Sequence, residues 1–97
     1  MEALSRKLEF DKKGQMVFTF GDNWSLSVIN NGYGAREGLF EIAPMADDNI
    51  QYVEGISTEL DDVRGYLTEE QVFEYVDKMA KITDHPPKHN DSSLPYW

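Results

Sequence analysis

Residues 61–82, DDVRGYLTEEQVFEYVDKMAKI, carry the strongest local signal in the chain, that of an amphipathic helix with its lead-in. Thr68 is a favourable N-cap, and Gln71, three residues later, completes a capping-box pattern. Leu67 and Val72 occupy the two positions of a hydrophobic staple, which fixes the angle at which the chain enters a helix. The sequence therefore predicts a helix that begins immediately after Thr68.

The apolar residues of this predicted helix fall on one side. They recur at helical spacing and form a single stripe: Val72, Phe73, Val76, Met79 and Ala80. Residues 61–66, ahead of the cap, are expected to form a short helical turn. Because a single apolar stripe needs another element to cover it, we expect the N-terminal half of the chain to supply a sheet.

Alternating apolar and polar residues predict β-strands in that half of the chain. The predicted strands comprise residues 5–11, 15–20, 24–30, 39–43 and 50–56. Pro44 is expected to end the fourth strand, because proline cannot donate a hydrogen bond to a sheet ladder. The short connections favour antiparallel pairing. The predicted fold class is therefore α+β, an antiparallel β-meander of four to five strands packed against one C-terminal amphipathic helix.

The chain length of 97 residues accommodates one domain. We assign residues 1–84 to a single α+β domain, and residues 85–97, which are rich in proline and lack periodicity, to a flexible, disordered C-terminal tail. Residues 94–97, LPYW, are apolar, and three alternatives are open for them: docking on a partner, folding back onto the body of the protein, or remaining disordered with no role. The chain has no cysteine, no apolar run long enough to span a membrane and no signal-peptide core near residue 1, which predicts a soluble cytoplasmic protein.

Negative charge is concentrated in one part of the chain. Residues 1–45 carry six acids and five bases, a net charge of −1, whereas residues 46–84 carry eleven acids and three bases, a net charge of −8. Direct binding of nucleic acid is therefore not expected, because phosphate contacts require lysine and arginine. An acidic surface instead attracts a basic partner, although it can also serve only to keep a small protein soluble.

The sequence offers few groups for catalysis or metal binding. His85 and His89 have the spacing of helical metal ligands, but the two prolines between them disfavour a helix. Adjacent carboxylates, as at residues 61–62, point in different directions on a helix or strand and do not converge. The glycine-rich residues 31–34 lack the lysine of a phosphate-binding loop. We therefore expect no enzymatic activity, no cofactor and no bound metal ion.

Three short motifs resemble small uncharacterised proteins encoded by tailed bacteriophages. They are WSLSV at residues 24–28, FEIA at residues 40–43, and DDVRGYLT at residues 61–68 ahead of the acidic capped helix. The resemblance implies a phage product that acts in the cytoplasm of the host bacterium. It carries over no catalytic or binding residues.

The concentration of acidic residues leads us to expect a protein–protein interaction module. In the phage context that the resemblance implies, the module would be an inhibitor or DNA-mimic-like binder of a basic host protein. The spacing of the helical acids places three of them on one solvent-facing stripe, and tyrosine and arginine are favoured at interface hot spots. The expected partner-binding residues are Asp61, Asp62, Glu69, Glu70, Glu74, Asp77, Tyr33 and Arg36.

A second hypothesis belongs to a different class. The chain would be a self-associating structural or assembly protein without catalytic activity. Association would run through an exposed sheet edge, whose unpaired backbone groups can bind a further strand, or through the apolar residues 94–97.

Overall fold

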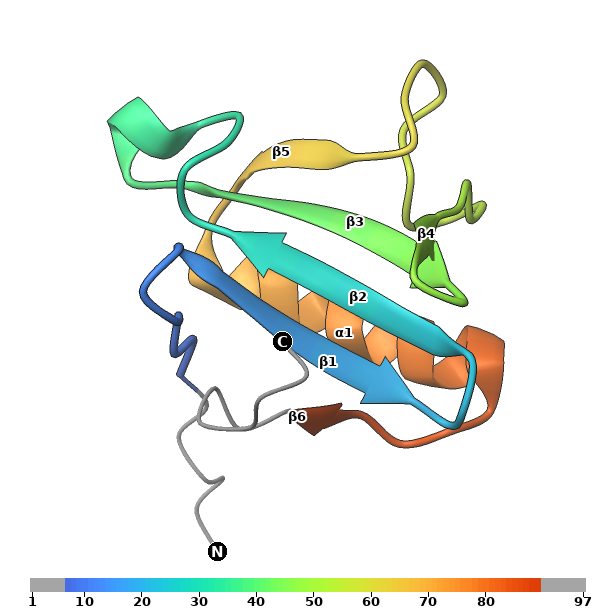
Figure 1. Cartoon of the computed structure of the whole chain (residues 1–97). Coiled ribbons are helices and arrows are strands. Elements are labelled where there is room, and N and C mark those ends of the chain that lie inside the picture. Colours follow the sequence, from blue (N-terminus) through green and yellow to red (C-terminus); the bar gives the residue numbers. More distant parts are fainter. Residues whose placement is uncertain (1–6, 90–97) are drawn as a thin grey trace, which may run out of the picture.

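Residues 7–89, which the computed structural model describes, form one sheet and one long helix. The elements are, in chain order, β1 (Gln15–Phe20), β2 (Trp24–Ile29), the 3-10 helix η1 (Ala35–Glu37), β3 (Phe40–Ala46), β4 (Asn49–Ile50), β5 (Arg64–Leu67), α1 (Glu69–Thr83) and β6 (Lys88–His89). The strands pair antiparallel in the order β4-β3-β2-β1-β6, and β5 shares one edge of β3 with β4 (Figure 1). The predicted α+β class, a meander with one C-terminal helix, is confirmed.

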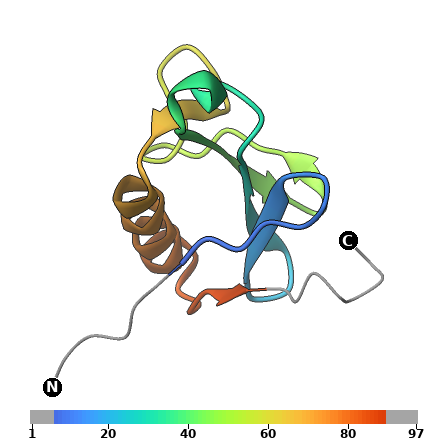
Figure 2. The same ribbon diagram turned by 90° about the vertical axis from the view of Figure 1, so that its left-hand side faces the viewer.

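Helix α1 covers one face of the sheet, and the core lies between them (Figure 2). Three residues of the apolar stripe of α1, Val72, Val76 and Met79, are each 0% exposed, and Phe73 and Ala80 are partly buried beside them. The strands contribute every second residue to the same cluster: Met16, Phe18, Phe20, Leu26, Val28 and Ile42. The period of two in the strands and the period of 3.6 in the helix therefore meet in a single core.

The start of α1 has the predicted capping box. The Thr68 N–H donates to Gln71 Oε1 at 2.9 Å, and the Gln71 N–H donates to Thr68 Oγ1 at 3.2 Å. At the other end Asp84 adopts the left-handed conformation, with φ 58°, and its N–H donates to the Ala80 carbonyl. Both ends thus satisfy backbone groups that a helix otherwise leaves unpaired.

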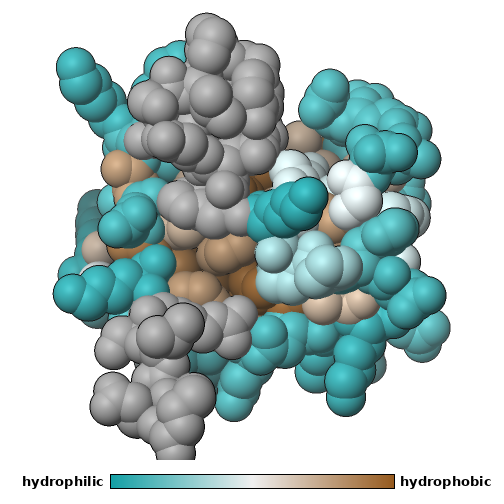
Figure 3. Space-filling view, turned by 90° about the horizontal axis from the view of Figure 1, so that it is seen from below, coloured by the Kyte–Doolittle hydropathy of each residue, from teal (hydrophilic) through white to brown (hydrophobic). Residues whose placement is uncertain are grey.

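Residues 7–11, the described part of the first predicted strand, are not a strand. The Asp11 side chain accepts a hydrogen bond from the Lys13 N–H at 2.8 Å and so builds a turn that leads into β1. Phe10 nevertheless packs on the core and stacks on Phe40, with ring centroids 5.4 Å apart. On the face seen from below, apolar residues lie at the centre and hydrophilic ones surround them (Figure 3). The alternation of apolar and polar residues in 7–11 therefore reflects the burial of Leu8 and Phe10, and not pairing with another strand.

Pro44 lies inside β3 rather than at its end, so the predicted strand boundary is wrong. Pro44 stands opposite Leu26 of β2, while its carbonyl accepts a hydrogen bond from the Gln51 N–H at 2.9 Å. In a strand the N–H and C=O of one residue point to the same side. The missing N–H of Pro44 therefore faces away from β2, and no ladder bond between β2 and β3 is lost.

The fifth predicted strand, residues 50–56, is largely irregular. Only its first residue belongs to β4, which a two-residue turn joins to β3. Asp47 and Asp48 form that turn, with φ 51° and 68°. Positive φ at both central positions matches the right-handed twist of the flanking strands in a tight hairpin.

Residues 64–67 form β5, where the sequence pattern predicted the end of a helical turn. β5 pairs with β3 around Phe40 and Ile42, at the part of the β3 edge that β4 leaves free. Arg64 ties this strand to the preceding loop, because its Nε donates to the Ile56 carbonyl at 2.8 Å. The same guanidinium lies over the Tyr75 ring at 4.9 Å from the centroid, so β5 is also held against α1.

The sheet continues into the segment predicted to be a flexible tail. Lys88 and His89 form β6 and pair with Thr19 and Phe18 of β1 (Figure 1). The Thr19 hydroxyl donates to the Lys88 carbonyl at 3.3 Å. The ordered part of the domain therefore extends past residue 84, and the rest of the predicted tail, residues 90–97, lies outside the described residues.

Candidate interaction surface

The outer side of α1 presents three of the expected partner-binding carboxylates. Glu70, Glu74 and Asp77 are exposed, on the side of the helix opposite the buried stripe. Lys78 and Lys81 follow Glu74 and Asp77 by four residues, a spacing at which opposite charges on a helix attract each other. The stripe is therefore acidic toward the start of α1 and mixed in charge toward its end.

Glu69 has a structural partner within the chain. Its Oε2 accepts a hydrogen bond from the Leu8 N–H at 2.9 Å and so holds the N-terminal segment against the start of α1. This hydrogen bond makes the Glu69 carboxylate less available to a second protein.

Asp61 and Asp62 lie in the exposed loop before β5. The Asp61 carbonyl accepts hydrogen bonds from the N–H and the hydroxyl of Thr58, at 3.0 and 3.1 Å, which closes a tight turn. Next to them Leu60 is 98% exposed. This loop projects at one end of β5, whereas α1 begins after the other end (Figure 1). The structure therefore does not bring Asp61 and Asp62 together with the carboxylates at the start of α1.

Arg36 lies in η1 and Tyr33 lies just before it. Both are at the end of the sheet where β5 leads into α1 (Figure 1). Tyr33 is 57% exposed, and its backbone is fixed on both sides. Its N–H donates to Glu41 Oε1 at 2.9 Å, and its carbonyl accepts from the Tyr66 N–H at 3.1 Å. Tyr33 is thus an exposed ring on a rigid backbone, which limits the entropy that it would lose in a contact.

Tyr66 is a second exposed aromatic at this junction, and the sequence pattern does not select it. It is 61% exposed and has φ 59°, a left-handed conformation that is rare for an aromatic residue. Two glycines make the junction possible: a Cβ on Gly34 would lie 2.9 Å from Tyr66 Cα, and a Cβ on Gly65 would lie 2.4 Å from Tyr33 Cβ. The pairing of the η1 loop with β5 is a contact between distant segments, so no local signal in the sequence marks it.

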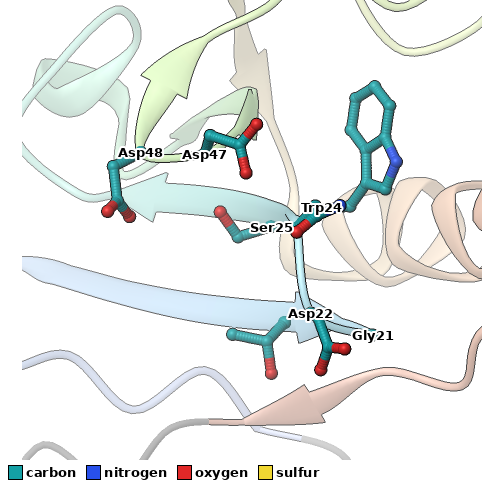
Figure 4. Close-up of a pocket in the computed structure, with 8 residues that line it drawn as sticks. Gly21, Asp22, Trp24, Ser25, Asp47 and Asp48 are labelled. Atoms are coloured by element: carbon teal, nitrogen blue, oxygen red, sulfur yellow. The ribbon is translucent and has the colours of Figure 1, made fainter.

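A shallow pocket lies between the β1–β2 and β3–β4 turns. Asp22, Asp47 and Asp48 are among the residues that line it, with Trp24 and Ser25 (Figure 4). The three carboxylates point in different directions, and the Trp24 ring points away from them (Figure 4). Within residues 7–89, no group of three or more His, Cys, Asp or Glu side chains is placed to hold a metal ion.

No protein-family model, curated protein or solved structure matches this chain. In the part of the chain that the structure describes, no helix has the length and apolar character needed to cross a bilayer.

Proposed function

We propose that this chain is an acidic protein–protein interaction module that binds a basic protein through the outer stripe of α1. The observation that carries the proposal is the exposure of Glu70, Glu74 and Asp77 on a helix whose opposite side buries Val72, Val76 and Met79 in the core. Because the core and the capping box hold α1 in place, a partner meets carboxylates at fixed positions. Preorganisation of this kind reduces the free-energy cost of binding.

The spacing of the stripe supports a partner whose basic surface also suits nucleic acid. Asp77 follows Glu70 by seven residues, which corresponds to a rise of about 10 Å along the helix axis. Three carboxylates over that length have an average spacing of about 5 Å along the axis, compared with about 3.4 Å between the charges of a single nucleic-acid strand. The stripe is a row of negative charges somewhat sparser than a nucleic-acid strand, and in this proposal it competes for a groove lined with lysine and arginine, where binding would inhibit the partner by occlusion.

The resemblance to phage-encoded proteins supports a bacterial host protein as the partner and the host cytoplasm as the site of action. The partner in this proposal is recognised by its positive charge alone. Catalysis, a cofactor and direct contact with nucleic acid form no part of the mechanism.

The test is a charge reversal on the stripe. The variant Glu70→Lys, Glu74→Lys, Asp77→Lys changes the formal net charge from −9 to −3, because each reversal adds two units. The control Glu37→Lys, Glu54→Lys, Glu59→Lys makes the same change at exposed positions away from α1. In a pull-down of the tagged protein from bacterial lysate, we expect the wild type and the control to retain a basic partner that rising salt releases.

The stripe variant is expected to lose that partner while its thermal unfolding midpoint stays within a few degrees of the control. An equal loss of the partner from both variants would show that net charge, and not the stripe, governs binding. Retention by the stripe variant at the wild-type level would refute the proposal.

One observation favours the second candidate, self-association. Among the described strands β5 pairs only with β3, so the backbone groups on its other edge, apart from the Tyr66 N–H that donates to Tyr33, can bind a further strand. Sedimentation velocity over a range of protein concentrations separates the two functions. A salt-insensitive dimer would favour the structural role, and a monomer at every concentration would exclude it.

A further inference from the structure

A second pocket lies between the β1–β2 turn and the end of α1. Its volume is about 450 Å³, within the range of pockets that hold small ligands. The residues that line it are Phe20, Gly21, Asp22, Asn23, Trp24, Thr83 and His85. Phe20 and Trp24 stand opposite each other in β1 and β2, on the face of the sheet that α1 covers. The pocket therefore lies on the helix side of the turn, at the edge of the core.

Trp24 supplies an aromatic wall of this pocket. Its side chain packs against the core and is only partly buried. Its ring points away from Asp47 and Asp48, which line the pocket on the other face of the sheet (Figure 4). Part of the indole surface is therefore left for a ligand, and an aromatic ring of this size is a favourable support for a hydrocarbon chain.

His85 supplies a second wall, which the backbone holds in place. The His85 N–H donates to the Ala80 carbonyl at 3.2 Å and so fixes this residue at the end of α1. The imidazole lies directly on the β1–β2 turn, because a Cβ on Gly21 would be 2.7 Å from His85 Cδ2. Gly21 also has φ 71°, a conformation that favours glycine. The walls of the pocket are therefore set by the fold before any ligand arrives.

The charges around the pocket favour a cation. Asp22 is an exposed residue that lines it, and none of the described residues that line it is lysine or arginine. Thr83, the last residue of α1, lines it as well. The last carbonyls of a helix have no partner within the helix and give this end a partial negative charge. A positive group in the pocket is thus attracted by a carboxylate and by the end of the helix.

The aromatic ring and the carboxylate are separate features of the pocket. The Trp24 ring and the Asp22 carboxylate point in different directions from the turn that carries them (Figure 4). A bare cation can contact only one of them, whereas a ligand with a carbon stem and a charged end can contact both. The same division into an apolar stem and a charged head is found in the side chain of lysine.

We propose that this pocket binds an alkylammonium group, with its carbon stem on the Trp24 ring and its charge between Asp22 and the end of α1. An ammonium group is compact and has three N–H donors, so it can donate to the carboxylate and to helix carbonyls together. A free amine and a lysine side chain of another protein present the same group. The inference does not depend on the proposed function, because binding is a property of the isolated protein.

Titration with n-butylammonium chloride tests the site. The probe is added at constant ionic strength and at pH 8, where histidine in water is neutral and does not repel a cation. Two-dimensional NMR follows the N–H signals, and the variant Trp97→Phe identifies the indole signal of Trp24. We expect saturable shifts at Gly21, Asp22, His85 and the Trp24 indole, with half-saturation in the millimolar range. Shifts that do not saturate, or that spread over acidic residues throughout the chain, would overturn the proposal.

Two further probes separate the stem from the charge. Ammonium chloride has the charge without a stem, and 1-butanol has the stem without a charge. Each should bind several-fold more weakly than n-butylammonium, because each contacts only one part of the pocket. Binding of 1-butanol as strong as that of n-butylammonium would show an apolar site and refute the cation.

A single substitution tests the role of the carboxylate. Asp22→Asn removes one negative charge at an exposed turn position, where asparagine is also favoured, so the fold should be retained. The control Asp62→Asn, in the exposed loop before β5, makes the same change in formal net charge, from −9 to −8. We expect Asp22→Asn to raise the half-saturating concentration of n-butylammonium several-fold and the control to leave it unchanged. Equal weakening in both would assign binding to net charge and overturn the proposal.

The two sources of the group are then distinguished in a pull-down from bacterial lysate. If the wild type retains a basic partner that Asp22→Asn loses and Asp62→Asn keeps, the ammonium group is a lysine of that partner. If Asp22→Asn loses affinity for n-butylammonium but retains the same proteins as the wild type, the group belongs to a free amine. Both results support the site, and a wild type that binds no partner at all leaves the titration as the test.

Discussion

At the scale of single residues, Tyr66 is the position where the local conformation conflicts most clearly with the residue type. Its φ of 59° costs an L-residue about 1 to 2 kcal/mol relative to glycine. The conformation persists because the Tyr66 N–H donates to the Tyr33 carbonyl and because β5 is paired with β3. Strain that the surroundings impose tends to occur at sites with a function.

Two substitutions at Tyr66 separate the strain from the side chain. Tyr66→Ala removes the ring and keeps the strain, whereas Tyr66→Gly removes both. We expect the glycine variant to be the more stable of the two by about 1 kcal/mol in urea denaturation, even though glycine adds entropy to the unfolded chain. An alanine variant as stable as the glycine variant would show that this backbone carries no strain.

At the scale of elements, the capping box sets where α1 begins. Thr68→Ala removes the side chain that accepts a hydrogen bond from the Gln71 N–H, and should lower the free energy of unfolding by about 1 kcal/mol. Thr68→Ser retains the hydroxyl and should cost much less. The midpoints of urea denaturation measure both effects, and equal losses in the two variants would mean that the hydroxyl does not cap the helix.

The elements also show which features the sequence determines locally. The cap, stripe and end of α1 depend on residues within a turn of one another, so they are readable from the sequence. β5 depends instead on a free stretch of the β3 edge, and Pro44 is tolerated because of what lies on either side of β3. Both features depend on contacts between segments that are distant in the sequence. An alternation of apolar and polar residues within one segment cannot predict such contacts.

The candidate surface likewise has some features that the sequence predicts locally and others that depend on contacts between distant segments. The stripe of Glu70, Glu74 and Asp77 follows from helical spacing and is predictable. The hydrogen bond from Leu8 to Glu69 and the exposure of Tyr66 both arise from contacts across the chain. Sequence reasoning therefore identified acidic residues of the surface but could not say which of them the fold already uses.

At the scale of the whole molecule, the net charge of −9 acts over a very small body, with a radius of gyration of 12.7 Å. At 10 mM ionic strength the Debye length is about 30 Å, so every carboxylate repels every other across the molecule. At 150 mM it is about 8 Å, and only neighbouring charges interact. The compact state suffers this repulsion more than the expanded unfolded chain does.

Stability and partner binding should therefore respond to salt in opposite directions. Raising sodium chloride from 10 to 150 mM should increase the thermal unfolding midpoint of the wild type by a few degrees, while the same change weakens retention of a basic partner. The Glu37→Lys, Glu54→Lys, Glu59→Lys variant, with a formal net charge of −3, should show a much smaller rise in its midpoint. Differential scanning calorimetry measures both proteins. An equal rise in both would assign the effect to preferential exclusion of salt, and a fall in the wild type would mean that attractive pairs outweigh the repulsion among its acids.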